Sequence, residues 1–399
     1  MNLTQKIISA ACAAVLLSAC GGGGEPPPTA FPGLSVEGST AYLASNLHVY
    51  KFDAATGAES WRFPRADATA TATSALPGPF SGEPLKVGNI IVIGQSVAAK
   101  RANSTIFSND GSYGILFGIN ESDGTEKWRF TRATHEFIDG VATDGKLIFA
   151  ASGDYSLYAL DPNSPGSEGG NEPKVVWSFK TENKLWSKPL VADGVVYQPS
   201  LDHKLYALDA ATGKEKWRFE QSEASLGSTP VLKDGVLYFG SFNSNFYAVN
   251  AADGKLIWKQ PVGGWVWGEA TLAGDTVYVG DVKGGLFAFN TKDGSRKWAA
   301  DVGDTIRAKP IFVNNKLYVL SMNTNVYEFD LTSAPDGTGK LAAKIVNDKI
   351  GRRLLSTPHL ADGQLIVPLF DGDEKVVKVN LENKEKQALF PKPTAAPGK

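Results

Sequence analysis

A segment of about 40 residues recurs along this chain, and this repeat constrains the fold more than any other feature of the sequence. The clearest copies are HKLYALDAATGKEKWRF (203–219), SNFYAVNAADGKLIWKQ (244–260) and GGLFAFNTKDGSRKW (284–298). Their shared tryptophan position is occupied by Trp61, Trp128, Trp177, Trp217, Trp258 and Trp298. Two further copies carry Ala343 and Gln387 there, which makes eight units. A fixed period of this length indicates a repeat architecture.

Each unit divides into four short segments rich in β-branched and aromatic residues. Residues 228–260 read STPVL, VLYFGS, NFYAVN and KLIWKQ, separated by Asn-rich or Asp-Gly turns. Such segments predict strands, and eight four-stranded antiparallel units predict an all-β fold, an eight-bladed β-propeller. One blade cannot bury both of its faces, whereas a closed ring of blades can. The tryptophans are therefore expected to fill the gaps between blades, because their regular spacing disfavours the alternative of a ladder that stacks ligands.

The N-terminus is predicted to be a separate targeting segment. Residues 1–19 have the short apolar run of a secretory signal peptide, and Leu17-Ser18-Ala19-Cys20 resembles the lipobox of bacterial lipoproteins. We expect cleavage before Cys20 and acylation of its thiol, the alternative being a plain signal peptide with a chance cysteine. Gly21 in place of Asp removes the common signal for inner-membrane retention, so delivery to the outer membrane is expected.

The remaining boundaries follow from composition. Residues 20–30 are rich in Gly and Pro and are predicted to be a flexible tether, residues 31–390 the propeller, and residues 391–399 a disordered tail. No segment after the signal has 18 uninterrupted apolar residues, so no membrane crossing is expected there. Cys12 lies within the signal, so the mature domain is expected to contain no thiol for a disulfide or a metal site.

The repeat signature resembles the PQQ-type propeller repeat, with Asp209, Gly213, Lys214 and Trp217 as its fullest copy. Quinoprotein alcohol dehydrogenases share this fold, but they are usually much longer and hold their cofactor against a vicinal disulfide that this chain cannot form. The BamB family, lipoproteins of the outer-membrane β-barrel assembly machinery, is similar in length, lipobox and blade number. RRLLSTPHLADGQLIV (352–367) and LWSKPLVADGVVY (185–197) resemble blades of that family. One departure is the partner-docking loop, whose counterpart EASLGSTP (223–230) retains Leu226 but has no Arg.

The resemblance implies a lipid-anchored outer-membrane protein that faces the periplasm and binds a protein partner as a monomer within a complex, without a cofactor and without enzymatic activity. A quinoprotein dehydrogenase, or another propeller enzyme that uses Glu83 and Glu269 as acid and base, is the first alternative. A propeller that binds a glycan or small ligand is the second. The formal net charge of −2 and the absence of clustered Lys and Arg argue against nucleic acid as a partner.

Partner binding is predicted at the mouth of the axial channel. The residues three positions before the consensus proline of each unit vary, whereas packing positions would repeat: Ser81, Ile138, Trp186, Gly227, Trp267, Arg307 and Leu355. Residues one position before it are Glu83, Gly140, Lys188, Thr229, Glu269, Lys309 and Thr357. The candidate partner-binding residues are Trp186, Leu226, Trp267, Arg307, Arg352, Arg353 and Leu355, because Trp and Arg are enriched in interfaces. Inter-blade packing of the tryptophans, with solvated charges around them, is the alternative.

Other polar features have simpler interpretations. His48, His135, His203 and His359 are isolated, without the spacing of zinc ligands. The sequence DGDE (371–374) is interpreted as a solvated turn and not as a cation loop. Insertions at 64–80 and 96–114 are predicted on the same face as the channel mouth, and the insertion at 161–174 on the opposite face.

Overall fold

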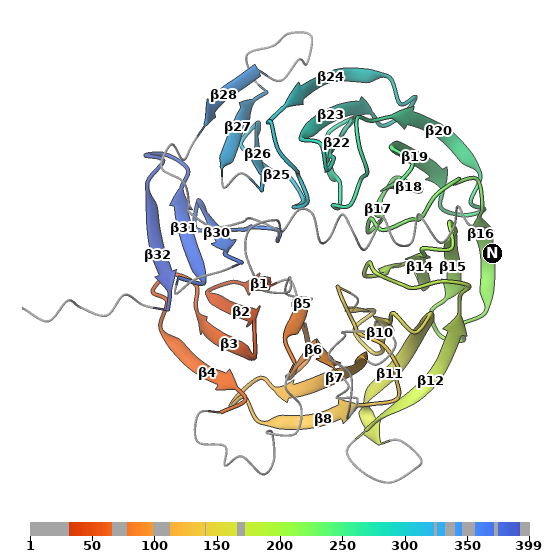
Figure 1. Cartoon of the computed structure of the whole chain (residues 1–399), viewed down its shortest axis with the longest axis vertical. Helices are drawn as coiled ribbons and strands as arrows, with labels where there is room; N and C mark the ends of the chain where they lie inside the picture. Colours follow the sequence, from red (N-terminus) through yellow and green to blue (C-terminus); the bar gives the residue numbers. More distant parts are fainter. Residues whose placement is uncertain are drawn as a thin grey trace, which may run out of the picture.

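The computed structural model describes residues 32–65, 78–98, 112–139, 141–165, 172–322, 325–331, 340–344, 356–370 and 374–391. These residues form eight four-stranded antiparallel sheets arranged as a ring around a central axis (Figure 1). The predicted eight-bladed β-propeller is confirmed. None of the described residues belongs to a helix capable of spanning a lipid bilayer.

Each blade is formed by four strands that follow one another in the chain. Blades 1 and 2 contain β1 (Gly33–Glu37), β2 (Thr40–Ser45), β3 (His48–Asp53), β4 (Glu59–Phe63), β5 (Phe80–Val87), β6 (Ile90–Ala98), β7 (Ser112–Asn120) and β8 (Glu126–Phe130). Blades 3 and 4 contain β9 (Val141–Thr143), β10 (Ile148–Ala151), β11 (Ser156–Pro165), β12 (Pro173–Lys180), β13 (Leu190–Ala192), β14 (Val195–Pro199), β15 (Leu205–Asp209) and β16 (Glu215–Phe219).

The second half of the ring repeats this order. Blades 5 and 6 contain β17 (Val231–Lys233), β18 (Val236–Gly240), β19 (Asn245–Asn250), β20 (Leu256–Pro261), β21 (Thr271–Ala273), β22 (Thr276–Gly280), β23 (Gly285–Asn290) and β24 (Arg296–Asp301). Blades 7 and 8 contain β25 (Ile311–Val313), β26 (Lys316–Leu320), β27 (Val326–Asp330), β28 (Lys340–Lys344), β29 (His359–Ala361), β30 (Gln364–Pro368), β31 (Val376–Asn380) and β32 (Lys386–Phe390). The first strand of each blade lies beside the axis and the fourth lies on the outer circumference (Figure 1).

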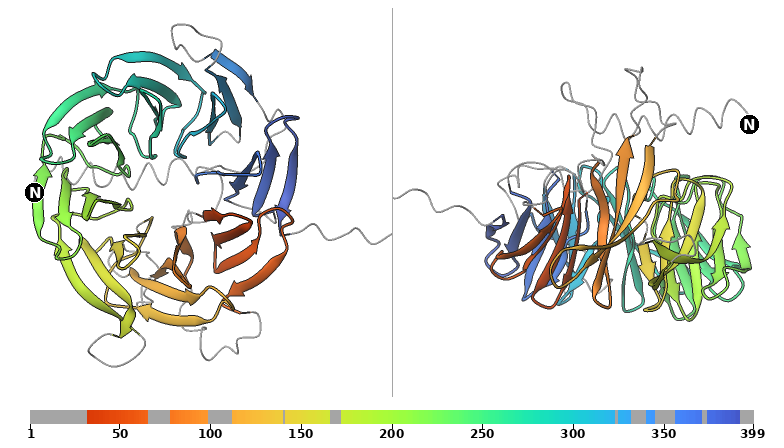
Figure 2. Two further views of the ribbon diagram at one scale, coloured as in Figure 1. Left: turned by 180° about the vertical axis from the view of Figure 1, so that it is seen from behind. Right: turned by 90° about the horizontal axis from the view of Figure 1, so that it is seen from below.

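The two faces of the disc carry different connections. The segments that lead into the innermost strands, and the loops that join the second and third strands, lie on one face, which we call the loop face. The turns between the first and second strands lie on the other, the turn face. In blade 4 that turn is Asp193-Gly194, both with positive φ, which Gly adopts readily and Asp more readily than most residues. On the loop face the hairpin β6–β7 rises above the disc (Figure 2).

The hydrophobic core is divided among the gaps between neighbouring blades. One cluster joins Tyr197 and Leu205 of blade 4 to Phe239 and Tyr247 of blade 5, and all four side chains are buried. Similar clusters fill the other gaps between blades. A blade is therefore stabilised mainly by its neighbours, as the repeat predicted.

Four outer-strand tryptophans form the same contact with the following blade. The Trp217 indole Nε1 donates a hydrogen bond to the Ala251 carbonyl of the next blade at 3.1 Å. The ring packs against Gly254, which has a φ of +71°, and a Cβ at that position would lie 2.5 Å from Trp217 Cε3. Glycine is thus required there by both conformation and space. The same pairing recurs at Trp61 with Gly124, Trp177 with Gly213 and Trp258 with Gly294.

The contact between blades 7 and 8 uses different residues for the same purpose. In blades 4 to 6 the tryptophan faces an alanine across the strand pair, as Ala248 faces Trp258, whereas in blade 7 Glu328 faces Ala343. The following turn carries Lys384, with a φ of +65°, in place of glycine. Lys384 reaches back to form an ion pair with Glu328, which Lys316 also contacts at 2.7 Å. Because no indole occupies this gap, the turn has room for a lysine side chain.

The ring closes without a shared strand. β1–β4 and β29–β32 are complete sheets built from the two ends of the described chain. Phe390 stacks on Phe52 at 4.6 Å between ring centroids and contacts Tyr50 edge-on at 5.0 Å. Lys378 Nζ donates to the Ala55 carbonyl at 3.0 Å, and Ser356 Oγ donates to the Pro32 carbonyl. Closure therefore depends on side-chain packing of the same kind as at the other blade junctions.

The predicted insertions are described in part. Of the segment 96–114, residues 96–98 and 112–114 extend the paired strands β6 and β7, so part of this insertion is a longer hairpin. The insertion at 161–174 likewise lengthens β11 and β12. Residues 66–77, 99–111 and 166–171 lie outside the described residues, as does most of DGDE (371–374).

Replacing Trp258 by Ala should lower the free energy of unfolding by about 3–5 kcal/mol, the range for large aromatic side chains removed from cores. Trp258 is 7% exposed, and its Nε1 donates to the Thr291 carbonyl at 3.1 Å. Trp258→Phe retains an aromatic ring but loses the indole N–H donor, so its free energy of unfolding should fall by less than that of Trp258→Ala. Equilibrium denaturation in urea measures both values. A loss below about 1 kcal/mol for Trp258→Ala would contradict the proposed role of this contact in core packing.

A candidate protein-binding site at the mouth of the axial channel

The loop face carries a cluster of aromatic side chains next to the axial channel. Trp186, Trp265 and Trp267 come from the segments that lead into the innermost strands of blades 4 and 6. Leu201 and Phe242 come from the loops between the second and third strands of blades 4 and 5. Leu201 and Phe242 are buried, and the tryptophans are half-buried against them. We call these five residues the aromatic cluster.

The aromatic cluster is an ordered stack. Phe242 lies between Trp265 and Trp267, with ring centroids at 5.3 and 5.2 Å and interplanar angles of 23°. Trp186 lies 5.9 Å from Trp267, tilted by 31°. The Arg307 guanidinium lies over the Trp267 ring, 4.2 Å from its centroid, which is the geometry of a cation–π interaction. The stack thus ends in a positive charge contributed by blade 7.

Small and apolar residues beneath the stack position it. A Cβ on Gly227 would lie 2.4 Å from Phe242 Cζ, so glycine at 227 is what allows the phenyl ring to lie there. Val266 is fully buried between the two half-buried tryptophans, and a Cβ on Gly240 would lie 2.1 Å from it. The alternation Trp-Val-Trp therefore anchors one side chain in the core and directs its two neighbours toward the surface.

The structure brings together Trp186, Trp267 and Arg307, three of the residues predicted to form the site. Leu226 does not join them, and its prediction as a partner-binding residue is wrong. Its side chain is fully buried in the core between blades 4 and 5, where it packs with Phe219 and Leu237. Cys20, Arg352, Arg353 and Leu355 lie outside the described residues.

Sequence reasoning missed Phe242, Trp265 and Leu201. The available signal was an apolar residue directly after Ser or Asp in the loop between the second and third strands. Leu201, Phe242 and Val282 occupy this position in blades 4 to 6, although loops on a surface are generally polar. Aligning only the residues before the consensus proline left these loops out.

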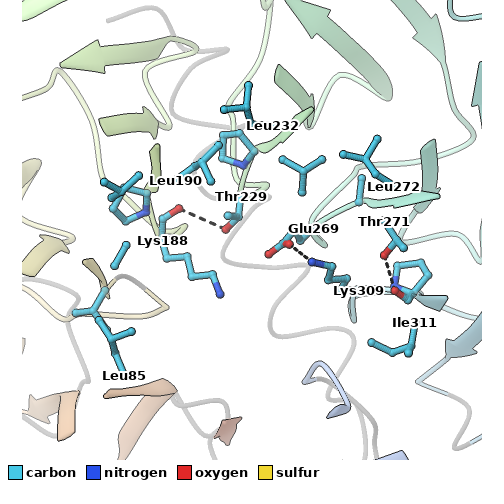
Figure 3. Close-up of a pocket in the computed structure, with 18 of the residues that line it drawn as sticks. Leu85, Lys188, Leu190, Thr229, Leu232, Glu269, Thr271, Leu272, Lys309 and Ile311 are labelled. Carbon is cyan, nitrogen blue, oxygen red and sulfur yellow. Dashed lines mark hydrogen bonds and ion pairs between the residues drawn. The ribbon is translucent and has the colours of Figure 1, made fainter. Parts of the chain in front are cut away.

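Six titratable side chains line the channel below the aromatic cluster, and we call them the charged ring: Glu83, Asp139, Lys188, Glu269, Lys309 and His359. Lys188 Nζ lies 2.8 Å from Glu83 Oε2, joining blade 4 to blade 2. Lys309 forms an ion pair with Glu269 of the neighbouring blade (Figure 3). His359 Nε2 lies 3.9 Å from Glu83 Oε1. Both glutamates, which sequence analysis considered as an acid and base, are therefore engaged by lysines.

Mutual attraction keeps Glu83 and Lys188 ionised. Enclosure within the channel acts to raise the pKa of Glu83, but the Lys188 ammonium, together with His359 and Lys309, outweighs it and holds the pKa below its ordinary value. Enclosure acts to lower the pKa of Lys188, and Glu83, Glu269 and Asp139 reverse the effect, so that pKa is raised. Enclosure also lowers the pKa of His359, which favours the neutral imidazole.

Asp139 behaves differently from the glutamates. Its side chain is exposed to the water of the channel but lies within the channel walls. This enclosure raises the pKa of Asp139 to about 7; Glu83 and Glu269 add to the increase, and Lys188 and Arg307 oppose it. Asp139 is thus a group in the charged ring that changes charge near neutral pH. Among the described residues, no three His, Cys, Asp or Glu side chains are grouped so that they could hold a metal ion.

Comparison with known families identifies the repeat. The sequence profile described as "Outer membrane protein assembly factor BamB" matches residues 45–168, 112–229 and 221–393, which together span nearly all of the propeller. The chain belongs to the BamB family. The resemblance inferred from Asp209, Gly213, Lys214 and Trp217 is thereby confirmed.

Individual BamB relatives are distant in sequence. The outer membrane protein assembly factor BamB of Burkholderia pseudomallei is 24% identical over 149 residues, covering 37% of this chain and 32% of the relative. The protein of the same name from Yersinia pestis is 24% identical over 226 residues, covering 46% of this chain and 55% of the relative. The chain thus spans about a third to a half of the length of these curated relatives.

The fold of a BamB protein is also similar. The crystal structure of BamB from Moraxella catarrhalis superposes with a TM-score of 0.66 at 18% identity, over 86% of this chain and 92% of that chain. This likeness concerns the propeller architecture. The side chains of the aromatic cluster must therefore be assessed on their own chemistry.

The free energy of unfolding should depend on pH because the pKa of Asp139 is higher in the folded than in the unfolded protein. The folded state retains this proton up to about pH 7, whereas the unfolded chain, with an ordinary pKa of 3.8, releases it much earlier. The stabilisation of the wild type relative to Asp139→Asn should therefore be present below about pH 4 and be lost as the pH rises to about 7. Thermal melts of both proteins across this range measure the difference. A difference that stays constant, or that grows with pH, would contradict the raised pKa.

Proposed function

We propose that this protein is a membrane-anchored periplasmic scaffold that binds a protein partner in outer-membrane β-barrel assembly. Membership of the BamB family supports the process, because the relatives are named outer membrane protein assembly factors. The single structural observation that supports the site is the aromatic cluster with Arg307 at the channel mouth. Partner binding is assigned to this cluster.

The chemistry of the aromatic cluster matches that of a binding hot spot. Hot spots in interfaces are enriched in Trp, Tyr and Arg, and they lie where a partner can exclude water from them. Trp186, Trp265 and Trp267 are half-buried, so their rings are already held in place and still expose apolar surface. A partner would bind them with little loss of side-chain entropy. Arg307 adds a cation that a carboxylate or carbonyl of the partner can contact.

A scaffold fits the charged ring better than an enzyme does. Glu83 and Glu269 would have to exchange protons in an acid–base reaction, but the carboxylate of each forms an ion pair with a lysine ammonium. No cofactor enters the proposal. The lipid anchor is assigned to Cys20, with the tether at residues 20–30 leaving the propeller free to orient on the periplasmic side of the outer membrane.

Trp267→Ala and Arg307→Glu should each reduce capture of the partner by tenfold or more, because a hot-spot residue contributes about 2 kcal/mol or more to binding. The assay is an affinity pull-down from detergent-solubilised membranes, with the wild-type protein expected to recover a component of the barrel-assembly machinery. Arg296→Glu is the matched control, because Arg296 is exposed on the outer strand β24, away from the channel mouth. The control should capture as the wild type does.

All three variants should melt close to the wild type, because these side chains are partly or fully exposed. Full capture by both cluster variants would refute the site while leaving the family assignment intact. If the wild type recovers no barrel-assembly component, the assembly role itself is wrong.

Cys20→Ser should convert the protein from a membrane-bound to a soluble periplasmic form, because acylation of the thiol is the anchor assigned here. Fractionation of cells into membrane and periplasmic extracts, followed by immunoblotting, measures the shift. The propeller of this variant should melt as the wild type does, since Cys20 precedes it in the chain. Continued recovery of Cys20→Ser in the outer-membrane fraction would show that another segment holds the protein there.

A further inference from the structure

Aspartate followed by glycine occurs at two kinds of turn in this propeller. Glycine has no side chain to shield its backbone nitrogen, so this nitrogen can attack the side-chain carboxyl of the preceding aspartate. Both residues are described for seven such pairs: Asp123-Gly124, Asp144-Gly145, Asp193-Gly194, Asp234-Gly235, Asp253-Gly254, Asp293-Gly294 and Asp362-Gly363. The structure separates these pairs by the surroundings of the two reacting groups.

Three pairs, which we call the open pairs, lie at the two-residue turns between the first and second strands of blades 4, 5 and 8: Asp193-Gly194, Asp234-Gly235 and Asp362-Gly363. Both residues of each pair are exposed, and a Cβ on any of the three glycines would have no heavy atom within 4 Å. Among the described residues, no hydrogen bond reaches the three carboxylates or leaves the three glycine nitrogens. Both reacting groups are therefore free in the open pairs.

Three other pairs, which we call the clamped pairs, lie at the turns between the third and fourth strands: Asp123-Gly124, Asp253-Gly254 and Asp293-Gly294. Their glycines are buried against the tryptophan of the preceding blade. In blade 5 the Gly254 nitrogen donates to the Asn250 carbonyl at 2.8 Å, and Asp253 Oδ1 accepts from the Lys255 nitrogen at 3.1 Å. The other two clamped pairs form the same two bonds. Both reacting groups are thus held in place.

Hydrogen bonding at the clamped pairs also disfavours the reactive form of the carboxyl. A carboxylic acid can lose its hydroxyl group as water, whereas a carboxylate has no such leaving group. The side-chain hydrogen bonds from Lys255 and Ser295 lower the pKa of Asp253 and Asp293, respectively. These two carboxyls therefore remain ionised to a lower pH than an ordinary aspartate does.

The pair Asp144-Gly145 separates the effect of exposure from that of hydrogen bonding. Both residues are exposed, at the turn between β9 and β10. However, the Gly145 nitrogen donates to Thr143 Oγ1 at 2.9 Å. Asp144 Oδ1 accepts from the Lys146 and Leu147 nitrogens at 2.8 and 2.7 Å. This pair is as accessible to water as the open pairs, but its reacting groups are held.

We propose that the three open pairs are sites of spontaneous isoaspartate formation, whereas the clamped pairs and Asp144-Gly145 keep their normal linkage. The glycine nitrogen forms a bond to the aspartate Cγ as a Cγ–O bond breaks. The proton of the nitrogen and the carboxyl hydroxyl leave as water, and a five-membered succinimide remains. Water then adds to the main-chain carbonyl of this ring and breaks its bond to nitrogen, so the chain continues through the side-chain carbonyl. The product has the mass of the original protein.

The open pair of blade 8 should react first. The Gly194 carbonyl accepts from the Ala210 nitrogen at 2.9 Å and the Gly235 carbonyl from the Ala251 nitrogen at 2.8 Å, which ties each turn to a second turn of the same blade. Among the described residues, the Gly363 carbonyl has no such bond. Attack on the carboxyl requires the glycine nitrogen to swing about the aspartate Cα–C bond, and a turn held at fewer points opens more often.

The rearranged linkage lengthens the turn in which it forms. It adds the aspartate methylene to the backbone of a turn of two residues that joins Ala361 to Gln364, which pair across β29 and β30. The register of these strands depends on the turn length, so the pairing of an innermost strand should be disturbed. The open pairs lie on the turn face, opposite the aromatic cluster. This proposal therefore goes beyond the scaffold function and can hold or fail independently of it.

The test measures isoaspartate at each pair in the purified wild-type protein after several weeks at mildly acidic pH and physiological temperature. Trypsin digestion, chromatography and electron-transfer dissociation distinguish the two linkages. Trypsin releases residues 234–255 as one peptide, so Asp234 and Asp253 are compared within the same molecule. Each open pair should convert at least about tenfold faster than any clamped pair or Asp144-Gly145, because those must first open locally. Protein unfolded in urea is the control, and there all seven pairs should convert at similar rates.

Two variants test the causes separately. Asp362→Glu retains a carboxylate but would have to form a six-membered ring, so it should show no rearranged linkage at position 362. Thr143→Val removes the oxygen that accepts from the Gly145 nitrogen, and conversion at Asp144 should rise about threefold or more. Circular dichroism melts verify that both variants fold, and the comparison among the wild-type pairs needs neither of them.

Three results would overturn the proposal. Similar rates at all the pairs of the folded protein would show that the fold protects none of them. Faster conversion at Asp253 or Asp293 than at Asp234 would reverse the expected order. Absence of isoaspartate from the open pairs, when the unfolded protein forms it, would show that these turns are held in a way that prevents ring closure.

Discussion

At four blade junctions the ring is held by the same contact, in which an outer-strand indole packs beneath the turn of the next blade and donates to its backbone. The contact couples three positions: the tryptophan, the small residue facing it across the strand pair, and the glycine of the following turn. Ala248, Trp258 and Gly294 are one such set. Each set links two neighbouring blades, so the same local contact, repeated along the chain, helps to align successive blades around the axis.

The junction between blades 7 and 8 lacks the indole, so other side chains there must both fill its volume and satisfy each other's polar groups. Removing the indole would leave a void next to a backbone carbonyl, and the chain fills it from both sides with Glu328 and Lys384. A buried carboxylate next to two ammonium groups is satisfied electrostatically, although such ion pairs are generally weaker sources of stability than apolar packing. This junction differs from the others at three positions together: Ala343 replaces the tryptophan, Glu328 the small residue and Lys384 the glycine. Any one of these changes alone would leave a cavity, a steric clash or an unpaired charge.

The fold could be predicted from the sequence because its determinants are local and repeat eight times. The site could be predicted only in part. Trp186, Trp267 and Arg307 stand at equivalent positions in different blades, so an alignment of the repeats finds them. Leu226 was predicted from the resemblance of residues 223–230 to a partner-docking loop, but whether its side chain points to the core or the surface is decided by its packing against blade 5. The Lys188–Glu83 ion pair could not be predicted, because it joins blade 4 to blade 2 across the channel. The sequence pattern does not specify the channel diameter, on which this distance depends.

The first and last blades are each complete sheets joined by side-chain packing, so the position of the chain ends in the ring is not fixed by the fold. Phe390 against Phe52 is a junction of the same kind as the others, so the chain ends hold no privileged place in the architecture. A circular permutant, in which a short linker joins residue 391 to residue 32 and new termini open at another blade boundary, would retain every inter-blade contact. The order of blades along the gene is thus one of eight cyclic orders compatible with the same circle.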